Sequence, residues 1–148
     1  MDIPQITPED AHGRMHREEK ERYIDVRSIP EFTQGHPEGA VNIPVLHFDG
    51  ERGGMVENPD FFKVVKANFP KDARLVMGCQ VGMRSQKAAE ILVQGGYQNV
   101  ANIQGGFGGM KDESGRTLAP GWTELRLPVS ADNGDGVSYE SLAAKAEG

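Results

Sequence analysis

A single cysteine, followed by a short glycine-containing loop and an arginine, is the part of this chain best suited to chemistry. Cys79 ends an apolar run that begins at Leu75, and Arg84 and Ser85 close the loop where a helical pattern begins. The amides of such a loop and the dipole of the following helix attract an anion, and the arginine adds a permanent positive charge. All three favour the thiolate, which is the nucleophilic form of cysteine. The stretch therefore predicts a cysteine nucleophile in an anion-binding loop.

Composition excludes several other kinds of function. The chain has 148 residues, a formal net charge of −6 and one cysteine. The negative charge argues against nucleic-acid binding, and no apolar run is long enough for a membrane span. A single cysteine excludes internal disulfides and multi-thiolate metal sites, so we expect no metal and no cofactor. The N-terminus resembles no signal peptide, which predicts a cytoplasmic location, and the oligomeric state stays open.

Strand-like and helix-like segments alternate along most of the chain. Helix-start signatures, each with a capping residue before a proline, occur at Thr7 and Asn58, and glycines at 95 and 96 mark a helix end. Strands are expected at residues 5–6, 23–26, 39–44, 74–78 and 99–103, and helices at 7–19, from 58 to about 69, and after the loop at 79–85. Residues 47–57 contain three glycines and are interpreted as a loop. This alternation is typical of an α/β fold with a parallel sheet covered on both faces.

The last nineteen residues differ in character from the rest. Residues 131–136 form a polar, glycine-rich linker, and residues 138–146 could form one capped helix with a thin apolar face. We therefore expect a domain over residues 5–129 and a tail over residues 130–148 that is mobile or only loosely docked.

Three motifs, in order, resemble the rhodanese family of sulfurtransferases. The first is Tyr-Ile-Asp-Val-Arg-Ser at 23–28 with Glu-Phe, Gly-His and Gly-Ala following, the second is the loop at 79–85, and the third runs from Asn-Val at 99–100 to Gly-Gly-Phe at 105–107. The form Gly-Cys-Gln-x-Gly-x-Arg-Ser is similar to thiosulfate sulfurtransferases of plants and bacteria. The family often places a tryptophan soon after the third motif, whereas this chain has Gly108-Gly109-Met110 there and Trp122 later.

The resemblance implies a rhodanese-like fold with a five-stranded parallel sheet flanked by helices on both faces. It also implies that Cys79 takes sulfane sulfur from thiosulfate or a glutathione persulfide and holds it as a persulfide. Cyanide or a thiol would then remove the sulfur, so the kinetics would be ping-pong.

The same resemblance assigns roles to the residues around the cysteine. The loop amides would stabilise the outer sulfur, and Arg84 would neutralise the sulfonate end of thiosulfate. Asp25 and Arg27 would support the loop through hydrogen bonds and an ion pair, with Glu31 as a further partner. The substrate-binding loop residues beside Arg84 are Gln80, Val81, Gly82, Met83 and Ser85.

Two other classes of function use related residues. Cysteine phosphatases and arsenate reductases also carry a cysteine, an anion-binding loop and an arginine, but such phosphatases place five residues between the two, and here four lie between Cys79 and Arg84. A shorter ring of amides suits one sulfur atom better than a tetrahedral phosphate. A non-catalytic rhodanese-like module used for binding or for carrying sulfur is the second alternative. Such modules typically lose the cysteine, which this chain keeps.

Overall fold

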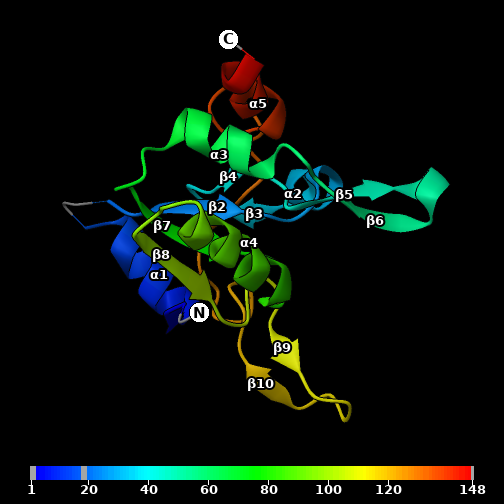
Figure 1. The fold of residues 1–148 in the computed structure, drawn as a ribbon. Helices are drawn as coiled ribbons and strands as arrows, with labels where there is room; N and C mark the ends of the chain where they lie inside the picture. Colours follow the sequence, from blue (N-terminus) through cyan, green and yellow to red (C-terminus); the bar gives the residue numbers. More distant parts are fainter. Residues whose placement is uncertain (1–2, 18–19, 148) are drawn as a thin grey trace.

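A five-stranded sheet forms the centre of the computed structural model, which describes residues 3–17 and 20–147 (Figure 1). Every neighbouring pair of strands in it is parallel. The order across the sheet is β1 (Gln5–Ile6), β8 (Asn99–Ile103), β7 (Arg74–Gly78), β2 (Arg22–Asp25) and β4 (Val41–Asn42). The predicted α/β fold with a five-stranded parallel sheet is confirmed.

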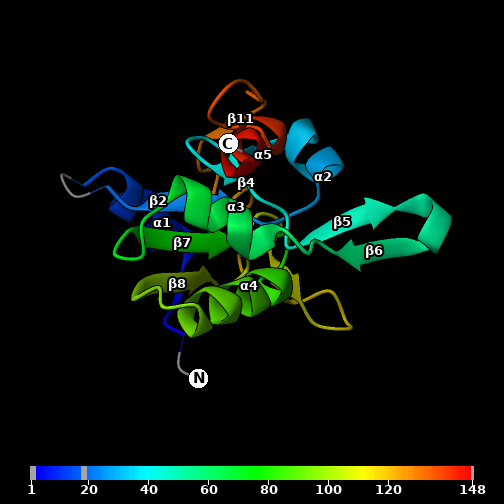
Figure 2. The same ribbon diagram turned by 45° about the horizontal axis from the view of Figure 1, so that its top comes forward.

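Side chains that alternate along the strands build one apolar core on each face of the sheet. Leu75 and Met77 of β7 belong to the core that residues of α3, α4 and α5 share, whereas Val76 belongs to the core that residues of α1 and α2 share. Figure 2 shows α3 and α4 on the near side of the sheet and α1 behind it. The helices are α1 (Pro8–Met15), α2 (Ile29–Gln34), α3 (Phe61–Asn68), α4 (Met83–Gln94) and α5 (Tyr139–Glu147). Helices therefore cover both faces, as predicted.

The helix starts follow the predicted capping chemistry with one shift. Thr7 caps α1, where its hydroxyl accepts a hydrogen bond from the Asp10 amide at 3.1 Å. The helix ends at Met15 rather than near residue 19, and residues 18 and 19 lie outside the described residues. The N-cap of α3 is Asp60 rather than the expected Asn58. The Asn58 side chain accepts a hydrogen bond from the Asp60 amide at 3.0 Å and shapes the turn before the helix.

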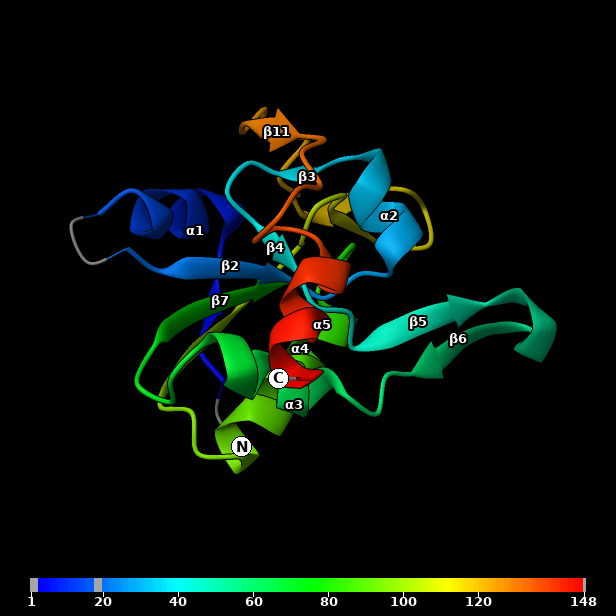
Figure 3. The ribbon, with the colours of Figure 1, turned by 90° about the horizontal axis from the view of Figure 1, so that it is seen from above.

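Residues 47–57 were expected to be a loop, and this expectation is wrong. They lie in an antiparallel hairpin of β5 (Leu46–Asp49) and β6 (Gly54–Glu57), joined by a short 3-10 turn at Gly50–Arg52. The hairpin projects away from the sheet (Figure 3). Its glycines mark the turn rather than a disordered segment, since Gly53 has a φ of +85°. Two smaller antiparallel pairs join β9 (Met110–Lys111) to β10 (Thr117–Ala119) and β3 (His36–Pro37) to β11 (Val129–Ser130).

The C-terminal segment forms α5 and lies against α3 (Figure 1). Leu142 is buried in the first core, and its carbonyl accepts a hydrogen bond from the Asn68 side chain at 3.0 Å. Sequence reasoning expected a mobile or loosely docked tail because the apolar face is thin, but Leu142 is buried and Tyr139, Ala143 and Ala146 pack against the same core. The division of the chain at residue 130 stays a prediction. No described helix is long and apolar enough to cross a bilayer.

Candidate active site

The Cys79 sulfur lies at the carboxyl edge of the sheet, one residue after β7 ends. Its residue is 1% exposed, so nearby donors act on it without competition from bulk water. Sγ accepts hydrogen bonds from the Gly82 amide at 3.0 Å and the Ser85 amide at 3.4 Å. Gly82 has a φ of +120°, a conformation that favours glycine and turns its N–H toward the sulfur. The predicted loop thus surrounds the sulfur with backbone donors at the start of α4.

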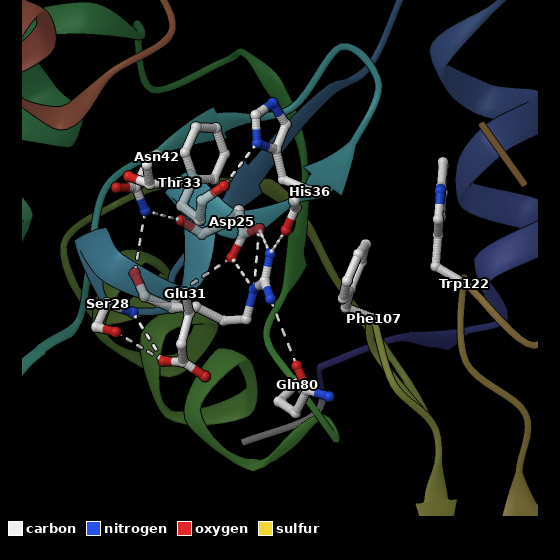
Figure 4. A network of polar contacts seen from close by, with 12 residues as sticks. Asp25, Ser28, Glu31, Thr33, His36, Asn42, Gln80, Phe107 and Trp122 are labelled. Atoms are coloured by element: carbon white, nitrogen blue, oxygen red, sulfur yellow. Dashed lines mark hydrogen bonds and ion pairs between the residues drawn. The ribbon is translucent and has the colours of Figure 1, made fainter. Parts of the chain in front are cut away.

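Arg84 is directed at a carboxylate rather than at the sulfur. Its two terminal nitrogens donate to the two carboxylate oxygens of Glu31 at 2.7 and 3.0 Å, a bidentate pair. Partial burial disfavours the charged form of Glu31, but hydrogen bonds from Arg84 and Ser28 outweigh it and lower the Glu31 pKa to about 2. Figure 4 shows the contact of Glu31 with Ser28. The hydrogen bond with Glu31 raises the pKa of Arg84. Sequence reasoning placed Glu31 with Asp25 and Arg27, and the structure places it with Arg84.

Asp25 and Arg27 form a separate, buried ion pair beside the loop. The Arg27 side chain donates to both Asp25 carboxylate oxygens at 2.9 to 3.1 Å and to the Gly35 carbonyl at 2.7 Å. It also reaches the Gln80 side chain at 3.4 Å, and its guanidinium lies 4.3 Å from the centre of the Phe107 ring. Asp25, Gln80 and Phe107 are therefore gathered around one cation (Figure 4).

The third motif supports the loop through its backbone. The amides of Gly105, Phe107 and Gly108 donate to the carbonyls of residues 81, 79 and 80 at 3.2, 2.8 and 2.9 Å. Gly106 has a φ of +53°, and a Cβ there would lie 2.3 Å from the Cys79 carbonyl oxygen, so this position requires glycine. The glycines predicted from the motif thus allow two backbone segments to touch.

Trp122 is a core residue and does not line a pocket at the loop. It is fully buried, and its ring packs edge-on against that of Tyr23 with the ring centroids 5.7 Å apart. Its indole N–H donates to the Pro128 carbonyl at 2.7 Å. The aromatic ring beside the loop is that of Phe107. Trp122 therefore does not take the place of the tryptophan that the family often has soon after the third motif.

Comparison with known proteins agrees with this geometry. The family model of the rhodanese-like domain matches residues 7–113. The chain belongs to the rhodanese-like domain family. Among its relatives, thiosulfate sulfurtransferase 16 of Arabidopsis thaliana is 42% identical over 86 residues, which cover 58% of this chain and 70% of that protein. Rhodanese-like domain-containing protein 15 of the same plant is 36% identical over 108 residues, or 73% of this chain and 52% of that protein.

A solved structure has the same fold. The crystal structure of Rv0390 from M. tuberculosis superposes with a TM-score of 0.73 at 25% identity, covering 89% of this chain and all of that one. The rhodanese-like domain described here spans about half the length of the first relatives that it matches. The expected cytoplasmic location is contradicted by the relatives of this chain. The two Arabidopsis proteins described above are named chloroplastic, and another relative is named mitochondrial.

The rhodanese-like loop brings together only part of the predicted site. The amides of Gly82 and Ser85 reach the sulfur, whereas the Gln80 side chain turns to Arg27 and the Met83 side chain is 72% exposed. Val81 is half-buried and contributes a carbonyl to the third motif. Within the ranges that the structure describes, no three metal-ligating side chains converge.

Sequence reasoning gave one residue of the site the wrong partner and missed another. Glu31 could have been placed from the capping pattern Ser28-x-x-Glu31, which fixes it at the start of α2 facing the loop. Asn102 is a polar residue inside the apolar strand β8, and its side chain accepts a hydrogen bond from the Ser85 hydroxyl. A buried amide within a strand is a signal of a specific hydrogen-bond partner.

Among the grooves that adjoin the loop, two are lined by Glu31. One, of about 470 Å³, is mostly polar and contains Arg27, Gln80 and Phe107. The other, of about 480 Å³, is mostly apolar and lies between α2 and the β5–β6 hairpin, where Phe48 and Met55 face it. The Glu31–Arg84 pair thus lies at the border between a polar and an apolar surface.

Proposed function

We propose that this protein is a sulfurtransferase that carries sulfane sulfur on Cys79. The observation that carries the proposal is the pair of amides, from Gly82 and Ser85, that donate to a buried thiol sulfur at the start of a helix. Such donors stabilise negative charge on sulfur without the reorganisation that water would need. Membership of a family that includes proteins named thiosulfate sulfurtransferase supports the same reaction type.

In the first half-reaction the Cys79 thiolate attacks the outer sulfur of a donor such as thiosulfate or glutathione persulfide. A new sulfur–sulfur bond forms to Cys79, the donor's own sulfur–sulfur bond breaks, and its electron pair leaves with sulfite or glutathione. The persulfide then carries its negative charge on the outer sulfur, beside the loop amides. No oxidant is needed, because the sulfane sulfur keeps its oxidation state: Cys79 supplies the electron pair of the new bond, and the leaving group keeps the pair of the broken bond.

In the second half-reaction an acceptor attacks the outer sulfur, and Cys79 leaves as a thiolate. The same two amides stabilise this leaving group, so one device serves both halves of the cycle. We propose thiols rather than cyanide as the physiological acceptors, because the apolar groove at Phe48 and Met55 and the exposed Met83 suit an organic thiol. Turnover that strongly prefers cyanide over small organic thiols would contradict this choice of acceptor.

A phosphatase or arsenate reductase is less well supported by the same geometry. The guanidinium of Arg84 would have to hold the tetrahedral oxyanion, but both of its terminal nitrogens donate to the Glu31 carboxylate. Only four residues separate Cys79 from Arg84. Hydrolysis of an aryl phosphate, measured beside thiocyanate formation from thiosulfate and cyanide, distinguishes the two chemistries.

The direct test is to incubate the protein with thiosulfate and measure its intact mass and its peptides. We expect the mass of one added sulfur atom on the peptide that contains Cys79, and its loss on addition of a thiol. Cys79→Ser should carry no added sulfur and should abolish turnover. Turnover that survives in Cys79→Ser would refute the proposal.

A further inference from the structure

Asn102 carries a buried polar side chain next to the loop, although it belongs to a strand. It is 3% exposed, and its amide nitrogen donates to the Gly82 carbonyl at 3.2 Å and to the Gln5 side chain at 2.9 Å. Its amide oxygen accepts from the Ser85 hydroxyl. A buried amide is costly unless it is fully hydrogen-bonded, and here both ends are. The side chain thus joins β8 to two loop positions that donate to the sulfur.

The Gly82 carbonyl fixes the orientation of the Asn102 amide. A carbonyl oxygen can only accept, so the Asn102 nitrogen must face it and the Asn102 oxygen must face Ser85. The Ser85 hydroxyl has three acceptors within reach: the Asn102 amide oxygen, the Gly82 carbonyl at 3.2 Å and the Cys79 sulfur at 3.4 Å. Asn102 and Ser85 therefore form one hydrogen-bonded group with the loop around the sulfur.

We propose that Asn102 is a positioning residue for the Cys79 sulfur. Through the Gly82 carbonyl it holds Gly82 in the orientation that aims its N–H at Sγ, and through the Ser85 side chain it holds the first turn of α4, which supplies the second N–H. The anion is therefore stabilised by the two backbone amides that Asn102 holds in place.

This inference rests on the proposed role of Cys79 as the nucleophile, but it concerns only how readily the thiol ionises. It can therefore be tested without sulfur transfer. The printed sequence holds one cysteine, so the ultraviolet absorbance of the thiolate, followed against pH, reports on Cys79 alone once the same titration of Cys79→Ser is subtracted. Thiosulfate turnover, measured separately, decides the proposed function.

Asn102→Leu keeps the approximate shape of the side chain and removes its hydrogen bonds to Gly82, Ser85 and Gln5. The two amides that Asn102 holds donate to a charged group, and such hydrogen bonds are the strong ones. We therefore expect about tenfold less thiolate at a fixed pH, which is an upward move of the titration midpoint by about one pH unit. Asn102→Asp should move the midpoint further, because a carboxylate adds negative charge and turns an acceptor to the Gly82 carbonyl. Asn99→Ala is the matched control, since Asn99 lies at the exposed far end of β8 and donates to Asp72.

Ser85→Ala tests the part of the Asn102 network that runs through the first turn of α4. It removes the hydroxyl that joins Asn102 to this turn and contacts Sγ, so the thiolate fraction should fall about twofold at a fixed pH, a modest hydrogen-bond effect. A midpoint that stays the same or moves down in Ser85→Ala would overturn the link through Ser85. A wild-type midpoint in a folded Asn102→Leu would overturn the positioning role, and Asn102→Asp decides it if the leucine variant does not fold. Circular dichroism and thermal melting establish folding in each case.

Discussion

The bidentate pair between Glu31 and Arg84 allows two different roles for the arginine to be separated. If Arg84 braces the loop against α2, then Glu31→Gln and Arg84→Met damage the same interaction, and the double variant is little worse than either. If Arg84 instead binds the sulfonate of thiosulfate, then Glu31→Gln releases it and improves the use of thiosulfate. The geometry favours the brace, because both guanidinium ends are engaged by the carboxylate.

The size of the coupling follows from the electrostatics of Glu31. A pKa lowered from 4.5 to about 2 corresponds to roughly 3 kcal/mol in favour of the charged form. Ser28 supplies part of this, and the Glu31 side chain is 33% exposed, so solvent screening reduces the share of Arg84. We expect a coupling free energy of about 1 kcal/mol, which lowers the melting temperature by roughly 2 to 4 °C in either single variant.

Thermal melts of the wild type, both single variants and the double variant complete the cycle. The folded pKa of Glu31 lies below its unfolded value, so the stabilisation is complete above about pH 4.5 and is lost as the pH falls toward 2. The coupling should therefore be constant from pH 7 to 5 and decline below pH 4.5. Lys87→Met is the control, because its pair with Glu57 is more than half exposed on both sides and should contribute little. A coupling near zero, or a lower KM for thiosulfate in Glu31→Gln, would refute the bracing role.

Two further substitutions test the scaffold. Gly106→Ala should lower the free energy of unfolding by more than about 2 kcal/mol and abolish turnover, because the left-handed backbone and the contact with the Cys79 carbonyl both oppose a Cβ. Gly115→Ala, at φ +88° in open space, should cost only about 1 kcal/mol. Equal melting temperatures of the two variants would contradict the contact at Gly106. Leu142→Ala should cost about 2 to 3 kcal/mol in chemical denaturation while Lys145→Ala changes little, and a null effect of the leucine would show that α5 does not contribute to the core.

Features set by neighbouring residues were predictable from the sequence. The strand at 74–78, the loop after it and the helix that follows depend on an apolar run, one glycine and a helical pattern, all within about twenty residues. The Thr7 cap is equally local. Even the parallel sheet follows from the alternation of elements, because parallel strands need crossover connections. The loop around the Cys79 sulfur was predictable for the same reason: the amides that donate to this sulfur are three and six residues away.

Features set by contacts across the sheet were not predictable in this way. Arg84 and Glu31 are 53 positions apart, and sequence reasoning aimed each at another partner, since nothing local distinguishes one opposite charge from the next. Whether Trp122 lined the pocket, and how Asn102 would be satisfied, depended on which segments pack above the loop.

The sequence by itself therefore determined the candidate nucleophile, the alternation of elements that builds the central sheet, and the family. The tertiary structure decided what surrounds the Cys79 sulfur: an arginine held by Glu31 instead of facing the sulfur, and an asparagine from β8 that is hydrogen-bonded to the loop. The physical reason is that backbone donors are placed by local dihedral angles, whereas side-chain partners are chosen by packing between elements distant in the chain.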